Sequence, residues 1–340
     1  MPVDLAPLAQ SNRLLFAIPL QPLQGQRFQP TGFPNLGAAT YQTPQGQCLL
    51  VESAQSMANR LEATCWDTAS NAPVAALAGI SHVTVTRKGK FLTDSMLEAH
   101  RVNSPYLLKG KDKKFDALLK NALGEPDVGS LLRPRLAEVL FRLDLGSLLH
   151  GVFLSQSDIY GGRARLQRSL SAFIEAVGVQ VAPSGGVKND HVHPSKVEGD
   201  SENRFGNIPF ARDEYTAERI TLYANLDLAQ LRGYALGDDA TRLLVLLALY
   251  KLRRLLDGDL RLRTACDLEP VARDQVAASA PKGFALPDRE TLEADLRDTI
   301  GRCQERMQHT TVTFEDVLKK SKETETAGNV DPDENDDAGD

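Results

Sequence analysis

The sequence predicts an α+β fold: a modified RRM-like or ferredoxin-like palm, built on the split βαβ order, with large helical and loop insertions. Two observations support this fold class. A strand pattern is followed by a helix pattern and another strand pattern twice along the chain, around residues 13–87 and 219–266. The two units are separated by about 130 residues, which is too long for a structureless loop inside a compact domain.

The first unit begins with a strand. The alternation of Leu14, Phe16, Ile18 and Leu20 predicts a strand over residues 13–20. A short apolar strand is expected over residues 48–51, followed by a helix that Ser53 can cap. Its packing face consists of apolar residues at helical spacing: Ala54, Met57, Ala58, Leu61 and Cys65. The alternation of residues 82–87, HVTVTR, predicts the strand that completes the unit.

The second unit repeats this order. Residues 219–228 alternate and predict a strand, residues 240–256 predict a helix that is apolar almost all round, and residues 260–266, LRLRTAC, alternate again. If both helices cover one face of the sheet, the other face shows Tyr223, Arg261 and Arg263. Because the aromatic consensus of RNA-recognition domains is absent, we expect contact with a nucleic-acid backbone rather than with bases.

The remaining segments complete the predicted organisation. Helices are expected over residues 115–123, 135–143, 165–177 and 289–308. Residues 183–209 are rich in Gly, Asn, Asp, Ser and His and predict a long exposed loop or arm. The predicted parts are a palm in two halves, 11–87 and 212–270; an inserted helical region, 88–211, with the arm at about 183–209; a C-terminal helical segment, 271–320; and an acidic tail, 321–340.

The net charge of −6 comes from the C-terminus. The last twenty residues carry eight acids and one lysine, whereas the first 320 residues carry 38 basic and 37 acidic side chains. The tail has no aromatic residue and is expected to be disordered. Local basic clusters in the body permit binding to a polyanion.

Composition also excludes some classes of protein. No apolar run approaches the ~18 residues of a membrane helix, so no membrane association is expected. The N-terminus lacks the basic cluster and apolar core of a secretory signal. The four cysteines are widely spaced, which favours buried thiols in a reducing cytoplasm over disulfides or a zinc site.

The stretch from Gly25 to Trp66 carries the clearest candidate for ligand chemistry. A loop rich in Gly and Pro brings Arg27, Gln29 and backbone N–H groups close to the start of the predicted helix. Loop glycines and a helix N-terminus suit an anion such as a phosphate. The alternative is an ordinary turn followed by a solvated helix face.

The histidines offer weaker candidates. His191 and His193, next to Asp190, could bind a metal or transfer protons, but no third ligand lies at a recognisable spacing, so polar or phosphate-contacting loop residues are the default. His150 is expected to be a core residue, and for His100 both possibilities stay open. The sequence has no phosphate-binding P-loop, nucleophile elbow or dinucleotide fingerprint, and we expect no metal and no cofactor.

Two glycine pairs next to a basic residue could allow a phosphate to approach the backbone. They are Gly161-Gly162-Arg163 and Gly185-Gly186-Val187-Lys188-Asn189. Both patterns are short and occur often by chance.

Several segments taken together resemble one protein family. In chain order they are GQRFQPTGFPNLGAATY, CLLVESAQSMANRLEATCWD, LEAHRVNSPYL, SLLHGVFLS, SGGVKNDHV and LRLRTACDLE. They resemble the RAMP-superfamily backbone subunit, of the seventh Cas family, in the type I-G (formerly I-U) CRISPR effector complex. The resemblance covers roughly residues 11–270 and is specific, because VESAQSMANRLE is not a generic pattern. The C-terminal helix and the acidic tail match no motif of that family.

The resemblance implies a non-catalytic CRISPR RNA-binding subunit. Several copies would polymerise along one CRISPR RNA in a Cascade-like complex with other subunits, and the guide would pair with target DNA in antiviral defence. A thumb-like arm of one copy would fold over the RNA. Because base pairing reads the sequence in such complexes, a subunit without base-reading aromatics suits the task.

The resemblance also implies which residues contact the guide. The predicted backbone contacts are Arg27, Gln29, Ser53, Gln55, Asn59 and Arg60, with Arg101, Asn103, Arg163 and Arg165 as further candidates. The residues expected in or beside the arm are Lys188, Asn189, His191 and His193.

Two other functions stay open. The first is a RAMP-type endoribonuclease that processes CRISPR RNA, with His100, His191 and Asp190 as the residues to test, although no acid/base pair is spaced for that reaction. The second is a protein scaffold that binds no RNA.

Overall fold

The structure is a computed structural model that describes residues 2–33, 37–110, 113–124, 133–156, 159–188, 208–258 and 260–315. The predictions for Asn189, His191, His193 and the acidic tail at 321–340 lie outside these residues. For Lys188 the backbone alone is described.

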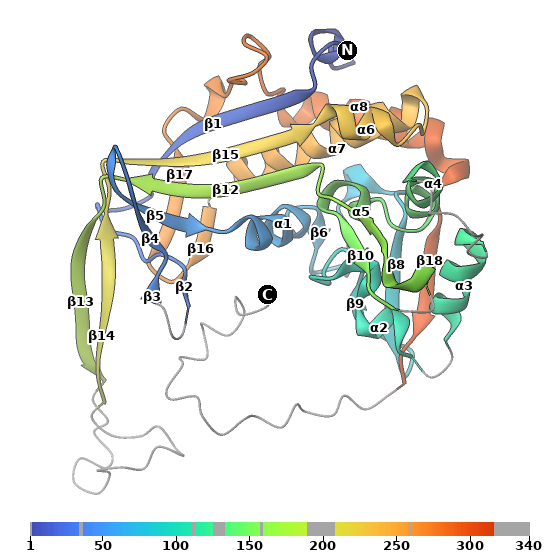
Figure 1. Cartoon of the computed structure of the whole chain (residues 1–340), viewed down its shortest axis with the longest axis horizontal. Helices are drawn as coiled ribbons and strands as arrows, with labels where there is room; N and C mark the ends of the chain where they lie inside the picture. The colour runs from blue at the N-terminus through green and yellow to red at the C-terminus, as the bar shows by residue number, and fades with distance from the viewer. Residues whose placement is uncertain are drawn as a thin grey trace, which may run out of the picture.

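A seven-stranded sheet forms the centre of the protein (Figure 1). Its strand order is β16-β17-β1-β15-β12-β5-β4, and every neighbouring pair is antiparallel. The strands are β1 (Arg13–Pro22), β4 (Thr40–Thr43), β5 (Gly46–Glu52), β12 (Leu170–Val177), β15 (Arg219–Asp227), β16 (Leu260–Arg263) and β17 (Cys266–Pro270).

Four strands of this sheet, together with two helices, form a split βαβ palm. Helix α1 (Ala54–Ala63) lies between β1 and β12 in the chain, and α7 (Asp238–Asp257) lies between β15 and β17. If β1, β12, β15 and β17 are numbered 1 to 4, their order in the sheet is 4-1-3-2. This antiparallel arrangement is that of ferredoxin-like and RNA-recognition domains, so the predicted α+β class is confirmed.

Two of the predicted elements were wrong. Residues 165–177, expected to be a helix, form β11 (Ala164–Leu166) and β12, and β12 is the strand that completes the first βαβ unit. Residues 82–87 do form a strand, β8 (His82–Arg87), but it lies in a separate sheet with β9 (Lys90–Asp94) and β18 (His309–Thr313). The palm therefore draws one strand from the predicted insertion 88–211 and does not include residues 82–87. The other predicted boundaries remain predictions.

Most of the other predicted elements are confirmed. Strands β1, β5 and β15 and helix α7 lie where the patterns placed them, as do α3 (Lys114–Leu123) and α4 (Arg133–Leu143). The single strand predicted over residues 260–266 is instead β16 and the first residue of β17, which pair as a hairpin. Helix α8 (Arg289–Cys303) ends earlier than predicted and is followed by η6 (Gln304–Arg306) and β18.

The core lies between one face of the seven-stranded sheet and the helices that cover this face. The inward side chains of β1, Leu14, Phe16 and Ile18, are buried, and α7 packs between the sheet and α8 (Figure 1). Fourteen of the twenty residues of α7 are buried, which explains why its sequence is apolar almost all round. Burying one such Leu or Val side chain contributes about 1.5–3 kcal/mol.

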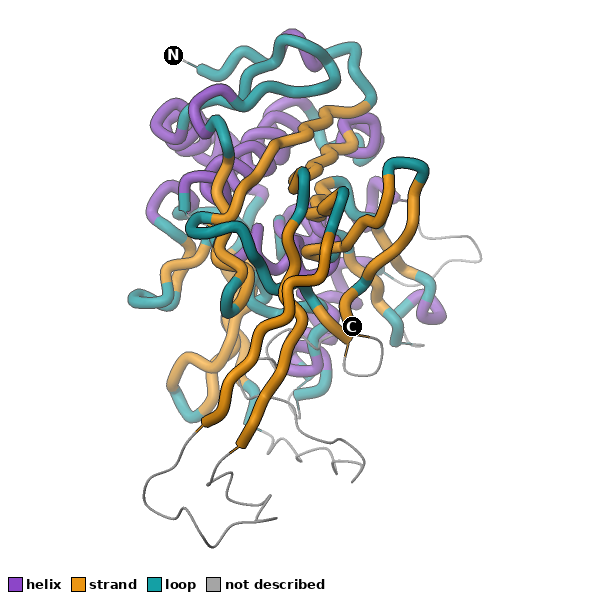
Figure 2. Tube along the Cα trace, turned by 90° about the vertical axis from the view of Figure 1, so that its left-hand side faces the viewer, coloured by secondary structure: helices purple, strands orange, loops and turns teal. Residues whose placement is uncertain are grey.

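A two-stranded arm extends from the palm (Figures 1 and 2). Its strands are β13 (Gln180–Lys188) and β14 (Ile208–Thr216), paired from Gln180↔Thr216 to Lys188↔Ile208. The two ends of the segment predicted as a loop or arm, 183–209, are thus strands. The base of the arm is joined to the loop between β1 and β2 (Gly32–Phe33), because Phe28 and Tyr215 exchange two backbone hydrogen bonds of 2.9 Å.

A second lobe packs beside the palm. It contains the sheet β18-β8-β9, helices α3, α4, α2 (Pro105–Leu108) and α5 (Gly146–His150), and the hairpin of β10 (Val152–Leu154) and β11. The remaining elements are η1 (Ala6–Leu8), β2 (Gly32–Phe33), β3 (Gly37–Ala38), β6 (Trp66–Asp67), β7 (Ala72–Pro73), η2 (Ala75–Leu77), η3 (Arg101–Asn103), η4 (Tyr160–Gly162), α6 (Leu228–Gly233) and η5 (Arg273–Gln275).

Two further sequence predictions can be compared with the structure. All four cysteines are buried free thiols, as expected. Among the described residues, no helix combines the length and the apolar character needed to cross a membrane.

Candidate nucleic-acid interface

Helix α1 begins where the sequence placed it. The Ser53 hydroxyl accepts a hydrogen bond from the Ser56 N–H at 3.2 Å, so the predicted N-cap is confirmed. Met57 and Leu61 are buried, whereas Gln55 and Asn59 are exposed on the opposite side. The first turn contains no acidic residue that would neutralise the positive end of the helix dipole.

A buried carboxylate, Glu52, ties the start of α1 to the palm. Its side chain is 1% exposed and binds two guanidinium groups: Arg60 Nε donates to Oε1 at 2.9 Å, and Arg263 Nη2 donates to Oε2. Arg60 also donates to the backbone carbonyls of Arg261 and Leu262. Two positive charges on one carboxylate leave the junction with a net positive charge.

The loop before α1 is held at the same junction. Gln29 is half-buried, its N–H donates to the Ala265 carbonyl at 2.8 Å, and its own carbonyl accepts from Arg263 Nη1 at 3.2 Å. We call this group, formed by the 27–29 loop, the start of α1 and the β16–β17 turn, the α1 junction.

Solvent-facing guanidinium groups border the α1 junction. The Arg27 side chain is 56% exposed and reaches Glu214 of the arm at 3.4 Å, where Arg212 also binds at 2.8 Å. The Arg261 side chain is 79% exposed, and its nearest carboxylate, on Asp267, is 3.9 Å away. Exposed amides and guanidinium groups at a helix N-terminus can donate hydrogen bonds to phosphate oxygens.

The six residues predicted at this junction thus differ in what their side chains do. Gln55, Asn59 and Arg27 face solvent, and Gln29 is half-buried. Ser53 caps the helix, and Arg60 is bound to Glu52. Contact of any of them with RNA stays a prediction.

Arg101, a further candidate, is a core residue. It is 4% exposed, Nη1 donates to the Ala99 carbonyl at 2.8 Å, and Nε lies 3.9 Å from Oε1 of Glu62 on α1. Because the Arg101 side chain is buried, it is poorly placed to contact a ligand at the surface. The sequence did not reveal this burial, because RVNSP has the composition of a polar loop.

Glu62 organises the buried ionic group to which Arg101 belongs. Its other oxygen, Oε2, accepts from Lys251 of α7, and Lys251 Nζ lies 3.1 Å from His150 Nε2. Burial, together with the charges of Lys251 and Arg101, holds the pKa of His150 well below its usual value, so the imidazole is neutral. His150 is therefore the core residue that the sequence predicted. At position 146, a Cβ would collide with the Glu62 carboxylate, so glycine is needed there.

The other candidates gather near η3. Asn103 is half-buried in η3, and β10 packs against η3. Arg163 and Arg165 are exposed on the segment that forms β11. Gly162 has a positive φ and lies where a Cβ would be 2.9 Å from the Ser155 carbonyl, so this glycine serves a tight turn.

One polar cluster was not predicted from the sequence. His82 Nδ1 lies 2.8 Å from Asp94 Oδ2, the Thr84 hydroxyl donates to the same oxygen, and the rings of His82 and His309 stack at 4.2 Å. Burial and the neighbouring His82 lower the pKa of His309. The two histidines are more than 220 residues apart, so spacing could not reveal the pair. Among the described residues, no three His, Cys, Asp or Glu side chains are arranged to hold a metal ion.

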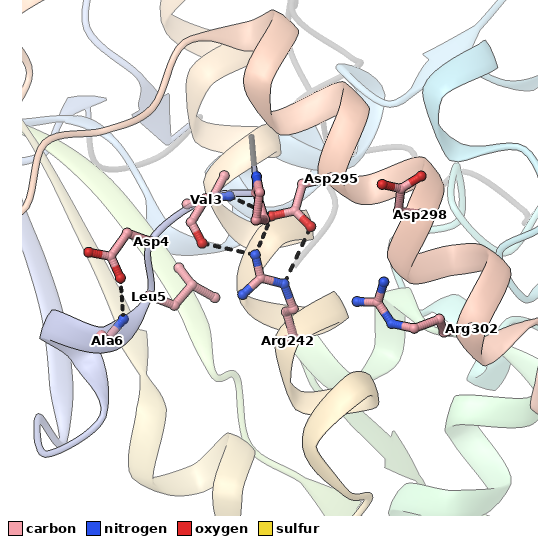
Figure 3. Close-up of a pocket in the computed structure, with 9 residues that line it drawn as sticks. Val3, Asp4, Leu5, Ala6, Arg242, Asp295, Asp298 and Arg302 are labelled. Carbon is pink, nitrogen blue, oxygen red and sulfur yellow. Dashed lines mark hydrogen bonds and ion pairs between the residues drawn. The ribbon is translucent and has the colours of Figure 1, made fainter.

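A cavity of about 660 Å³ lies between the N-terminal segment and helices α7 and α8 (Figure 3). Asp295 accepts from the Val3 N–H at 2.8 Å and pairs with Arg242, which donates to the Val3 carbonyl at 2.9 Å. These hydrogen bonds and this ion pair anchor the N-terminal segment to α7 and α8.

Comparison with known proteins connects part of this chain to one family. Residues 14–181, from β1 to the start of β13, match the model of a family described as "CRISPR-associated protein GSU0053 (Cas_GSU0053)". No curated protein matches the sequence. A solved chain described as "CRISPR RNA-guided surveillance complex, pre-nicking" is 15% identical, with a TM-score of 0.35, over 86% of this chain and 88% of that chain.

Proposed function

We propose, from the match of residues 14–181 to a CRISPR-associated family, that this protein is a non-catalytic subunit of a CRISPR effector complex that grips the guide RNA. More specifically, we propose that the protein is the backbone subunit of a type I-G complex in the cytoplasm. Several copies bind along one CRISPR RNA, other subunits complete the complex, and the guide pairs with target DNA.

The observation that carries the proposal is the chemistry of the α1 junction. Exposed Gln55 and Asn59, the exposed arginines Arg27 and Arg261 and a capped helix start lie around one positively charged junction. Such groups bind phosphates without reading bases. A subunit that holds a guide of any sequence needs this kind of contact.

The arm supports the same proposal. It begins at the α1 junction, where Phe28 pairs with Tyr215 and Arg27 contacts Glu214. A strand of RNA held at the junction lies beside the base of the arm, so β13 and β14 can fold over it as the thumb of this subunit.

The test is RNA binding by variants of the two exposed amides. We expect the double change Gln55→Ala and Asn59→Ala to weaken binding of a guide-length RNA roughly tenfold in a filter assay, since each lost hydrogen bond contributes about 0.5–1.5 kcal/mol. Arg261→Gln should lower the slope of log affinity against log salt by about 0.7.

The control for charge is Arg297→Gln on α8, where a 63% exposed arginine is paired with Glu293. Unchanged affinity and salt slope in both test variants would contradict the proposal. Incubation with labelled repeat RNA tests the alternative: specific cleavage that is lost in His191→Ala or His100→Ala would favour an endoribonuclease.

A further inference from the structure

The hairpin of β10 and β11 presents an exposed aromatic ring to solvent. Phe153 is 51% exposed, whereas its neighbours in β10, Val152 and Leu154, are buried. Phe153 is paired in register with Arg165 of β11, which is also exposed and lies between the buried Ala164 and Leu166. Because side chains alternate along each strand, Phe153 and Arg165 lie side by side on the outward face.

This face carries positive charge that the described part of the protein does not neutralise. Arg163 and Arg165 are exposed, and neither of them forms an ion pair or hydrogen bond with a described residue. Residues 151–170 contain one acid, Asp158.

We propose that this outward face, the Phe153–Arg165 face, is a second nucleic-acid contact that takes an unpaired base of a single strand. The base stacks on the Phe153 ring, and Arg165 and Arg163 bind the adjoining phosphates. The inference rests on the proposed function for the presence of a guide, but it uses residues outside the α1 junction.

The chemistry of the face favours a nucleic acid over a protein partner. A single apolar ring between unpaired arginines offers little apolar area to a protein, whereas stacking on an aromatic ring beside cationic side chains is how sequence-tolerant single-strand binders work. The sequence predicted contact with the nucleic-acid backbone alone. Phe153 lies on a hairpin outside the seven-stranded sheet and would add contact with a base.

The hairpin lies near the end of α1 that is remote from the α1 junction. β10 packs against η3, and the buried Arg101 of η3 lies 3.9 Å from Glu62, the second-to-last residue of α1. The Phe153–Arg165 face is therefore a contact separate from the α1 junction.

The experiment uses the full chain and a single-stranded uridine oligonucleotide that contains one 2-aminopurine. Stacking on Phe153 should quench the probe on binding. Phe153→Leu should abolish the quenching and weaken binding by roughly 5- to 100-fold, whereas Phe153→Trp should keep both. Arg165→Gln should lower the salt slope by about 0.7.

Two substitutions elsewhere serve as matched controls. Val271→Ala shortens an apolar side chain that is 57% exposed, and Arg297→Gln removes an exposed arginine of α8. Neither should change quenching. Circular dichroism should show a folded protein for Phe153→Leu, because the side chain that it replaces is half in solvent.

The outcomes separate this inference from the proposed function. Normal quenching and affinity in Phe153→Leu would overturn the inference, while loss of guide affinity in the Gln55/Asn59 variant would still support the α1 junction. If Phe153→Leu leaves binding intact and instead lowers self-association in sedimentation, the face is a protein contact and the inference is wrong. Lost quenching in Phe153→Leu with unchanged guide affinity in the Gln55/Asn59 variant would support the hairpin and contradict the α1 junction.

Discussion

Asn59 and Arg60 are adjacent on α1 but have different surroundings. Asn59 is exposed to solvent, whereas Arg60 binds the buried carboxylate of Glu52 and two backbone carbonyls of the β16 strand. Helical periodicity could place both residues on the polar face. It could not show that Glu52, eight residues earlier, and Arg263, two hundred residues later, would share one ion-pair network, because that depends on strand pairing.

This difference predicts different effects of substitution on stability. Arg60→Ala should lower the free energy of unfolding by about 2 kcal/mol, because it leaves a buried carboxylate with one partner fewer. Asn59→Ala should change it by less than about 0.5 kcal/mol. Urea denaturation of the two variants provides the measurement. If Arg60→Ala is as stable as Asn59→Ala, the pair with Glu52 does not stabilise the fold.

The same comparison decides how RNA binding is tested. A joint substitution of Asn59 and Arg60 would mix a loss of ligand contact with a loss of stability. The exposed pair Gln55 and Asn59 avoids this problem.

At the scale of elements, β12 shows why one pattern was misread. Leu170, Ala172, Ile174 and Ala176 are inward in the strand, but Phe173 and Val177 on the outward side are apolar too. With apolar residues on both sides, residues 165–177 satisfy the helical period as well as the strand period. Pairing with β15 and β5 on its two edges stabilises the strand, and this pairing is invisible in the local sequence.

Strand β8 shows the opposite case. Its alternation predicted a strand correctly, yet an alternating strand can pair in any sheet that needs one. Its partner β18 lies at the far end of the described chain, so the three-stranded sheet could not be predicted from residues 82–87 alone.

The docking of β18 on β8 should depend on pH. His309 stacks on His82, and its pKa is lowered from the usual 6.5 by burial and by His82, while Asp94 acts in the opposite direction. Below about pH 6.5 the unfolded chain therefore takes up this proton more readily than the folded protein. We expect stability to fall as the pH drops from 7 towards 5, because protonation favours release of β18.

Trp66, the one tryptophan of the sequence, can report this change because its ring lies 6.4 Å from that of His82. Urea midpoints followed by its fluorescence should decrease less steeply with falling pH in His309→Gln than in the wild type. His100→Gln, at an exposed histidine outside the cluster, should keep the wild-type dependence. Equal pH dependence in His309→Gln and the wild type would rule out His309 as the titrating group.

At the scale of the whole molecule, the arm and the second lobe extend from opposite sides of the palm (Figure 1). The split βαβ order was visible in the sequence because β1, α1, β15 and α7 each carry a regular period. The composition of the second lobe could not be predicted, because the lobe joins segments between residues 82 and 313 that meet through tertiary contacts alone.

This arrangement leads to a prediction about assembly. With a guide-length RNA, the protein should elute earlier in size-exclusion chromatography than without it, and absorbance at 260 nm and 280 nm should rise in the same peak. The control variant replaces residues 183–213 by Gly-Gly, which keeps the base of the arm from Gln180 to Ala182. Because a two-stranded ribbon adds little to the core, the palm should stay folded.

If the arm clamps the guide between neighbouring copies, the shortened variant should still bind a short RNA through the α1 junction but should form smaller assemblies on the long one. Equal assembly by both proteins would remove the arm from the proposal and leave the junction. If the wild type binds RNA and still elutes as a single copy on a guide-length strand, the protein holds its guide one molecule at a time, and the polymerising backbone proposed here is wrong.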